Sequence, residues 1–164
     1  MRYKVVPEPR DVDELLAIRD AVPLVPGSEE DCCSRVVART PVAGRDAARE
    51  WLTFLQALGL VAESDRGFHR TRDDPGREGL GERFLAGVFG AREVHDVVAD
   101  DGSTSPEAVF ASLRSEVPGW ERHRRPDWAE DWRERTVRLL GWGVVFSLFE
   151  EVDDGEYRIA SDGS

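Results

Sequence analysis

Apolar residues recur every three or four positions over most of the chain, a spacing that predicts a largely helical protein. The first half contains three such stretches, at residues 11–22, 28–39 and 45–58. Ser28 is a candidate N-cap for the second stretch, and Gly59 follows the third, where helices commonly end. Residues 60–71 surround a polar turn containing Gly67, so we expect a short two-stranded hairpin there.

The second half repeats this order. Residues 72–81 (RDDPGREGLG) are rich in proline, glycine and charge, which predicts a linker. Helical stretches follow at about 80–90, at 91–99, from Ser105 onward, and at about 126–140. Apolar residues from Val144 to Phe149 then predict a strand, and an acidic turn leads to a second strand at 157–159.

Helix, helix, helix and hairpin therefore occur twice, as a degenerate internal duplication. On residues 47–70 and 128–158, the sequence resembles the winged helix-turn-helix family. The resemblance implies a mainly α fold with small β wings, in the form of a tandem winged helix-turn-helix protein. We expect a first unit at residues 1–71, a linker at 72–81, a second unit at 82–160 and a tail at 161–164.

The charge composition is that of a salt-adapted protein. The chain of 164 residues has 33 acidic and 22 basic side chains and a net charge of -11, and Lys4 is its only lysine. Carboxylate-rich surfaces stay hydrated in concentrated salt, which suggests a halophilic source. Because molar salt screens charges beyond about 3 Å, the net charge says little about partners there.

Few features indicate a membrane, a metal or a disulfide. No apolar stretch approaches the roughly 20 residues of a membrane span, and the N-terminus lacks the apolar core of a signal peptide. We therefore expect a cytoplasmic protein. Cys32 and Cys33 are adjacent, too few for a disulfide framework and without metal-ligand spacing. We expect one buried and one partly exposed thiol.

The family resemblance implies that the third helix of a unit lies in the major groove of DNA and the wing touches the backbone. A helical projection of residues 45–58 places Arg45, Arg49, Thr53 and Gln56 opposite the apolar residues Trp51, Phe54, Leu55 and Leu58. Leu52 departs from this pattern because it falls close to the polar face. Arginine can pair with guanine or phosphate and glutamine with adenine. Further phosphate contacts are expected from Arg35, Arg39, Arg66 and Arg70.

The second unit has a different third helix. Trp128, Trp132, Thr136 and Leu139 form its predicted buried face, and Glu130, Asp131, Glu134 and Arg138 lie opposite. Its carboxylates oppose DNA phosphates, so we expect this unit to bind protein, with self-association through the apolar strand 144–149. The cluster Arg122-His123-Arg124-Arg125, between Trp120 and Trp128, is more simply a basic loop beside core tryptophans than a single-stranded nucleic-acid site.

Enzyme motifs are absent from the sequence. The histidines His69, His95 and His123 are dispersed, and no phosphate-binding or nucleophile motif is present. We expect no catalytic residue, cofactor or metal. The predicted function is a DNA-associated, transcription-regulator-like protein, and the alternative is a protein-interaction adaptor without DNA binding. A continuous basic strip of Arg35, Arg45, Arg49 and Arg70 would favour DNA, whereas arginines paired with carboxylates would favour the adaptor.

Overall fold

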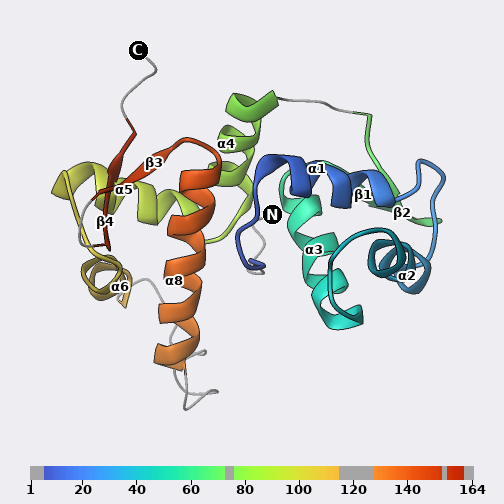
Figure 1. Ribbon diagram of the computed structural model, residues 1–164, viewed down its shortest axis with the longest axis horizontal. Coiled ribbons are helices and arrows are strands. Elements are labelled where there is room, and N and C mark those ends of the chain that lie inside the picture. The colour runs from blue at the N-terminus through green and yellow to red at the C-terminus, as the bar shows by residue number, and fades with distance from the viewer. Residues whose placement is uncertain (1–5, 73–75, 115–127, 153–154, 161–164) are drawn as a thin grey trace. The chain divides into compact units, whose positions relative to one another are not determined.

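The computed structural model describes residues 6–72, 76–114, 128–152 and 155–160. Helices predominate, and two small antiparallel sheets of two strands each accompany them (Figure 1). This confirms the mainly α fold with β wings. The chain divides into two units, Met1–Phe89 and Gly90–Ser164. The basic cluster at 122–125 and the tail at 161–164 lie outside the described residues.

The first unit consists of α1 (Val12–Ala21), α2 (Glu29–Arg39), α3 (Arg45–Ala57), β1 (Val61–Ser64), β2 (Gly67–Arg70) and α4 (Gly76–Gly87). Local side chains determine where the first two helices start. The carboxylate of Asp11 accepts a hydrogen bond from the Glu14 amide at 2.8 Å, and the Ser28 hydroxyl accepts one from the Asp31 amide at 3.0 Å. Both are N-caps of the usual kind. Ser28 therefore has the capping role that the sequence predicts.

The core of the first unit forms around the aromatic residues of α3. Trp51 and Phe54 meet edge to face, with ring centroids 6.0 Å apart, and Phe54 meets Phe84 of α4 at 6.5 Å. Leu15 and Ile18 of α1 are also buried. Burial of these side chains is the main force that holds α1, α3 and α4 in one unit.

The second unit consists of α5 (Ala91–Asp101), α6 (Pro106–Leu113), α8 (Trp128–Val145), β3 (Phe149–Val152) and β4 (Glu156–Ile159). Ser105 caps α6 by accepting a hydrogen bond from the Ala108 amide at 3.2 Å. Trp142 is fully buried and stacks on Phe146 at 5.4 Å. The two units thus each contain helices followed by a β wing, as the duplication predicts.

Two sequence predictions need correction. Residues 76–81, predicted as linker, form the first half of α4, and the units divide between Phe89 and Gly90. The predicted strand 144–149 is also wrong, because α8 continues to Val145 and β3 begins only at Phe149. Gly143 lies inside this helix, where the ring of Phe149 occupies the space of a side chain: an ideal Cβ at position 143 would lie 2.1 Å from the ring. Tertiary packing thus overrides the low helix propensity of glycine.

The two units share the same backbone hydrogen bonds at corresponding positions. Gly27 exchanges two hydrogen bonds with Phe68, and Thr104 exchanges two with Tyr157. Gly27 and Thr104 each immediately precede the serine that caps the second helix of their unit. The duplication predicted from the order of the elements therefore extends to individual hydrogen bonds.

The ends of the third helices also correspond. The amide of Leu60 donates to the carbonyl of Leu55 at 2.9 Å, and the amide of Leu148 donates to that of Gly143 at 2.8 Å. These are the bonds of a helix C-terminus that ends on a left-handed residue. Leu55 of α3 is therefore level with Gly143 of α8, which aligns the two helices.

The left-handed residue differs between the units: it is Gly59 after α3 (φ 74°) and Ser147 after α8 (φ 62°). A side chain is strained in this conformation and glycine is not. We predict that Ser147→Gly stabilises the second unit by about 0.5–1 kcal/mol. Urea unfolding at constant KCl would measure the change. Ser147→Ala, which removes the hydroxyl but keeps the strained backbone, serves as the control. A glycine variant no more stable than the alanine variant would contradict this explanation.

Candidate nucleic-acid interface

Helix α3 has one buried and one solvent-facing side. It starts after Gly44, whose φ of 90° is one that side chains rarely adopt. Trp51, Phe54 and Leu55 are buried in the unit, and Leu52 is buried as well. The buried side is therefore wider than the projection indicates, and Leu52 does not interrupt the exposed side.

The predicted DNA-reading residues lie on α3 as expected, but in different surroundings. Arg45 and Arg49 lie one turn apart, each with 58% of its side chain exposed. Thr53 and Gln56 are half-buried. Exposed arginines therefore occupy the beginning of α3, and the smaller polar residues follow toward its end.

Both exposed arginines are paired with carboxylates from the first turn of α2. Arg45 lies 2.8 Å from Glu30, and Arg49 lies 2.8 Å from Glu29, where its Nε donates a hydrogen bond. The sequence prediction did not include either glutamate. The capping serine at position 28 was the available signal, because it places both residues in the first turn of a helix that packs against α3.

Two other predicted DNA contacts are directed toward the end of α1. The Nε of Arg35 donates to the carbonyl of Ala21 at 3.2 Å. Arg70 forms an ion pair with Asp20 at 3.1 Å, and Asp20 also pairs with Arg19. Cations near a helix C-terminus are stabilising. Arg35 and Arg70 therefore join α2 and the wing to α1.

The remaining two predicted phosphate contacts, Arg39 and Arg66, are exposed. Arg39 is the last residue of α2, and Arg66 lies in the turn between β1 and β2. Arg35, Arg45, Arg49 and Arg70 do not form one basic strip, because three of them pair with carboxylates and one with a backbone carbonyl. This pairing is the arrangement expected of the adaptor alternative.

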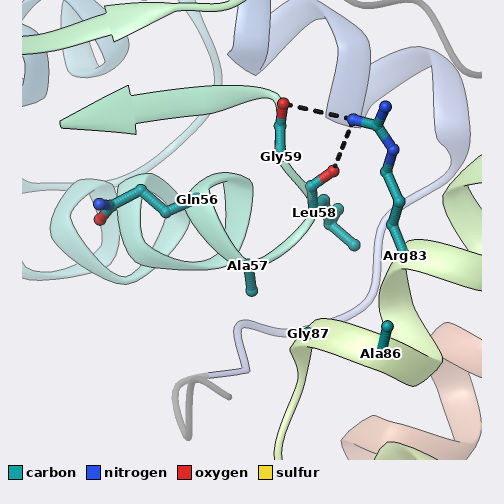
Figure 2. Close-up of a pocket in the computed structure, with 7 residues that line it drawn as sticks. All are labelled: Gln56, Ala57, Leu58, Gly59, Arg83, Ala86 and Gly87. Carbon is teal, nitrogen blue, oxygen red and sulfur yellow. Dashed lines mark hydrogen bonds between the residues drawn. The ribbon is translucent and has the colours of Figure 1, made fainter. Parts of the chain in front are cut away.

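The C-terminal end of α3 is held by Arg83 of α4. Its Nη1 donates to the carbonyls of Leu58 and Gly59, at 3.1 and 3.3 Å (Figure 2). These groups border a hollow of about 410 Å³ lined by residues 56–59, 83, 86 and 87. Gln56 lines the hollow too, but its amide points away from the guanidinium (Figure 2). Arg83 is a third residue that sequence reasoning missed, because its partners are backbone atoms and leave no sequence pattern.

The two cysteines belong to the core of the first unit. Both are buried, which corrects the expectation of one partly exposed thiol. The Cys32 sulfur lies 3.8 Å from the carbonyl of Gly27 and 3.7 Å from that of Phe68. Burial raises the pKa of both thiols. Reactive cysteines have a lowered pKa and some exposure, so neither residue has the features of a nucleophile.

The third helix of the second unit presents carboxylates to solvent. Glu130 and Glu134 are exposed, and Glu134 pairs with Arg138 at 2.8 Å. Trp132, Thr136 and Leu139 are buried as predicted, whereas Trp128 is only half-buried. The exposed side of α8 therefore carries Glu130 and Glu134 together with Arg133.

Neither a metal site nor a membrane helix is found in the part of the chain that the structure describes. It contains no group of three or more histidine, cysteine or acidic side chains that could hold a metal ion. None of its helices combines the length and the apolar character needed to cross a bilayer. The ring of His95 in α5 packs against the ring of Phe149, with centroids 5.9 Å apart, and its Nδ1 atom lies 4.0 Å from the Oδ1 atom of Asp96.

Comparison with known proteins identifies a family. The sequence model described as a halobacterial double winged helix domain matches residues 1–162. This agrees with the salt-adapted composition and with the two winged units of the fold. No curated protein and no solved structure matches the chain.

We predict that the buried cysteines make the protein less stable at alkaline pH. The folded state keeps both thiols protonated at a pH where the unfolded chain has lost these protons, because burial raises their pKa. The free energy of unfolding that the protonated thiols contribute is fully present below the unfolded pKa of about 8.5. It is lost as the pH rises above that value.

Urea unfolding of the wild type and of Cys32→Ala/Cys33→Ala, at pH 7.5 and 9.5, tests this. The double variant should be less stable at both values but should lose less stability between them. An equal loss in both proteins would show that other groups cause the alkaline dependence.

Proposed function

Because the chain belongs to the halobacterial double winged helix domain family, we propose that it is a non-enzymatic, regulator-like cytoplasmic protein whose α3 contacts duplex DNA. The second unit supplies a surface for protein association. This division of roles follows the charges of the two third helices. The exposed charges of α3 are Arg45, Arg49 and Asp46, and those of α8 are Glu130, Glu134 and Arg133.

One observation carries the proposal. Arg45 and Arg49 extend from the solvent side of α3, opposite the buried Trp51 and Phe54, and each is more than half exposed. Arginine is the side chain best suited to guanine edges and phosphates, because its guanidinium donates two parallel hydrogen bonds. The third helix of a winged unit is the element that enters the major groove.

The ion pairs with α2 are compatible with this role. Exposed ion pairs typically stabilise a protein by only about 0–1 kcal/mol, and salt screens them further. A DNA phosphate or guanine could replace Glu29 and Glu30 as the partner of each arginine at little cost. In the unbound protein, the ion pairs with Glu29 and Glu30 keep both guanidinium groups on the solvent-facing side of α3.

A second candidate function is favoured by the same pairs. Arg45, Arg49 and Arg70 each have a carboxylate partner, as expected of an adaptor that binds protein alone. Glu29, Glu30 and Asp31 at the start of α2 would also face an approaching phosphate backbone. This alternative predicts that the protein, when folded, binds no DNA.

Fluorescence anisotropy with a labelled mixed-sequence duplex distinguishes the two functions. We predict that the wild type binds, that binding weakens as KCl rises, and that Arg45→Glu/Arg49→Glu abolishes it. Circular dichroism at each KCl concentration would verify folding, since low salt can unfold so acidic a chain.

A matched control is Arg92→Glu/Arg158→Glu, which changes the net charge equally but acts on exposed arginines of the second unit. It should retain most of the binding. Equal losses in the two double variants would mean that net charge, rather than α3, governs binding. No binding by the folded wild type would favour the adaptor.

A further inference from the structure

The alignment of α3 with α8 pairs each residue of one third helix with a residue of the other. Five aligned pairs are buried in both units. They are Ala48 with Thr136, Trp51 with Leu139, Leu52 with Leu140, Phe54 with Trp142, and Leu58 with Phe146. The agreement of burial supports the alignment derived from the hydrogen bonds. The exposed residues can therefore be compared position by position as well.

One ion pair is present in both units. In the first, Arg45 of α3 pairs with Glu30; in the second, Arg133 of α8 pairs with Glu107 at 3.7 Å. Arg133 is level with Arg45, and both glutamates stand two residues after the capping serine of their unit. The pair thus joins the second helix to the third at the same place in each unit.

The surroundings of the two arginines differ in one respect. The guanidinium of Arg133 lies over the ring of Phe110, 4.9 Å from its centroid. Cys33 holds the position of Phe110 in α2. Burial raises the pKa of its thiol, and Arg49 and Arg45 lie close enough to lower it, Arg49 more than Arg45. Arg133 therefore covers a buried residue of the preceding helix, whereas the link between Arg45 and α2 rests on the ion pair with Glu30.

The other ion pair between α2 and α3, Arg49–Glu29, has no counterpart at the corresponding positions of the second unit. Level with Arg49 and Glu29 are Val137 and Pro106, and Val137 is 50% exposed. Level with Thr53 and Gln56 are Gly141 and Val144. The two units therefore share the Arg45 position and differ at the other three positions of the predicted DNA-reading face.

We propose that Arg49 makes the DNA contact of α3, whereas Arg45, like Arg133, is a positioning residue that joins the second and third helices. An ion pair that both units contain supports a property that both units have, which is their fold. A pair found in only one unit serves what is particular to that unit. The DNA contact of Arg49 rests on the proposed function, but the positioning role of Arg45 does not.

The test compares Arg45→Ala with Arg49→Ala in the full-length protein, by anisotropy with the mixed-sequence duplex. The two side chains are equally exposed and carry the same charge, so long-range electrostatic effects are matched. Arg49→Ala should weaken binding about tenfold or more and lower the salt slope by about one. Arg45→Ala should weaken it less than about threefold. Glu29→Gln, which releases Arg49, should strengthen binding by up to about fivefold.

Thermal unfolding gives a separate measure of the positioning role. Arg45→Ala and Arg133→Ala should each lower the Tm by about 1–3 °C, and Arg49→Ala should change it less. In a double-mutant cycle, Glu30→Ala should add little to Arg45→Ala, because both remove the same pair.

The outcomes separate the inference from the proposed function. If the wild type binds DNA and the two arginine variants lose equal affinity, α3 contacts DNA but the division of roles is wrong. If the wild type binds no DNA while folded, the proposed function fails and the role of Arg49 fails with it. An unchanged Tm in Arg45→Ala and Arg133→Ala would overturn the positioning role in either case.

Discussion

Two backbone hydrogen bonds between Gly27 and Phe68 join the wing of the first unit to the residue before its second helix. They fix the chain immediately before Ser28, which then caps α2. Glu29 and Glu30 follow in the first turn and meet the arginines of α3. Position 67 must be glycine for this contact, because a Cβ there would lie 2.3 Å from the Gly27 carbonyl oxygen. The geometry of the candidate interface thus depends on a contact between the wing and the α1–α2 connection.

The second unit uses the same contact to present a different surface. Thr104 and Tyr157 make the equivalent bonds, Ser105 caps the helix, and Glu107 meets Arg133. Apart from Arg45 and Arg133, solvent-facing residues of the third helix play little part in this framework, so they can differ between units without a change of fold. At the next turn one unit exposes Arg49 and the other exposes Val137. In concentrated salt, where long-range attraction is weak, such local differences have more influence than net charge.

The sequence predicted those features that depend on neighbouring residues. The cap at Ser28, the helix that starts at Ser105, the end of α3 before Gly59 and the first hairpin all follow from local turn and capping preferences. The predicted end of α8 was wrong because the apolar run 144–149 indicates a strand, whereas the helix continues to Val145 and packs Gly143 against the ring of Phe149. Residues 76–81 have the composition of a linker but form part of α4, whose following turns bury Phe84 in the core of the unit. The partners of Arg35, Arg45, Arg49 and Arg70 all come from other elements, and for this reason a projection of α3 alone could not identify them.

The close approach of α4 to the end of α3 restricts how the candidate interface can respond to a partner. An ideal Cβ on Gly87 would lie 2.1 Å from the carbonyl oxygen of Ala57, so the two backbones touch with no side chain between them. Arg83 holds the next two carbonyls of the same helix end. Axial sliding of α3 toward α4 is blocked by this contact, and sliding away from it would break the bonds to Arg83. Any partner of α3 therefore meets a helix fixed in position, and the adjustment on binding falls to the arginine side chains and to the partner itself.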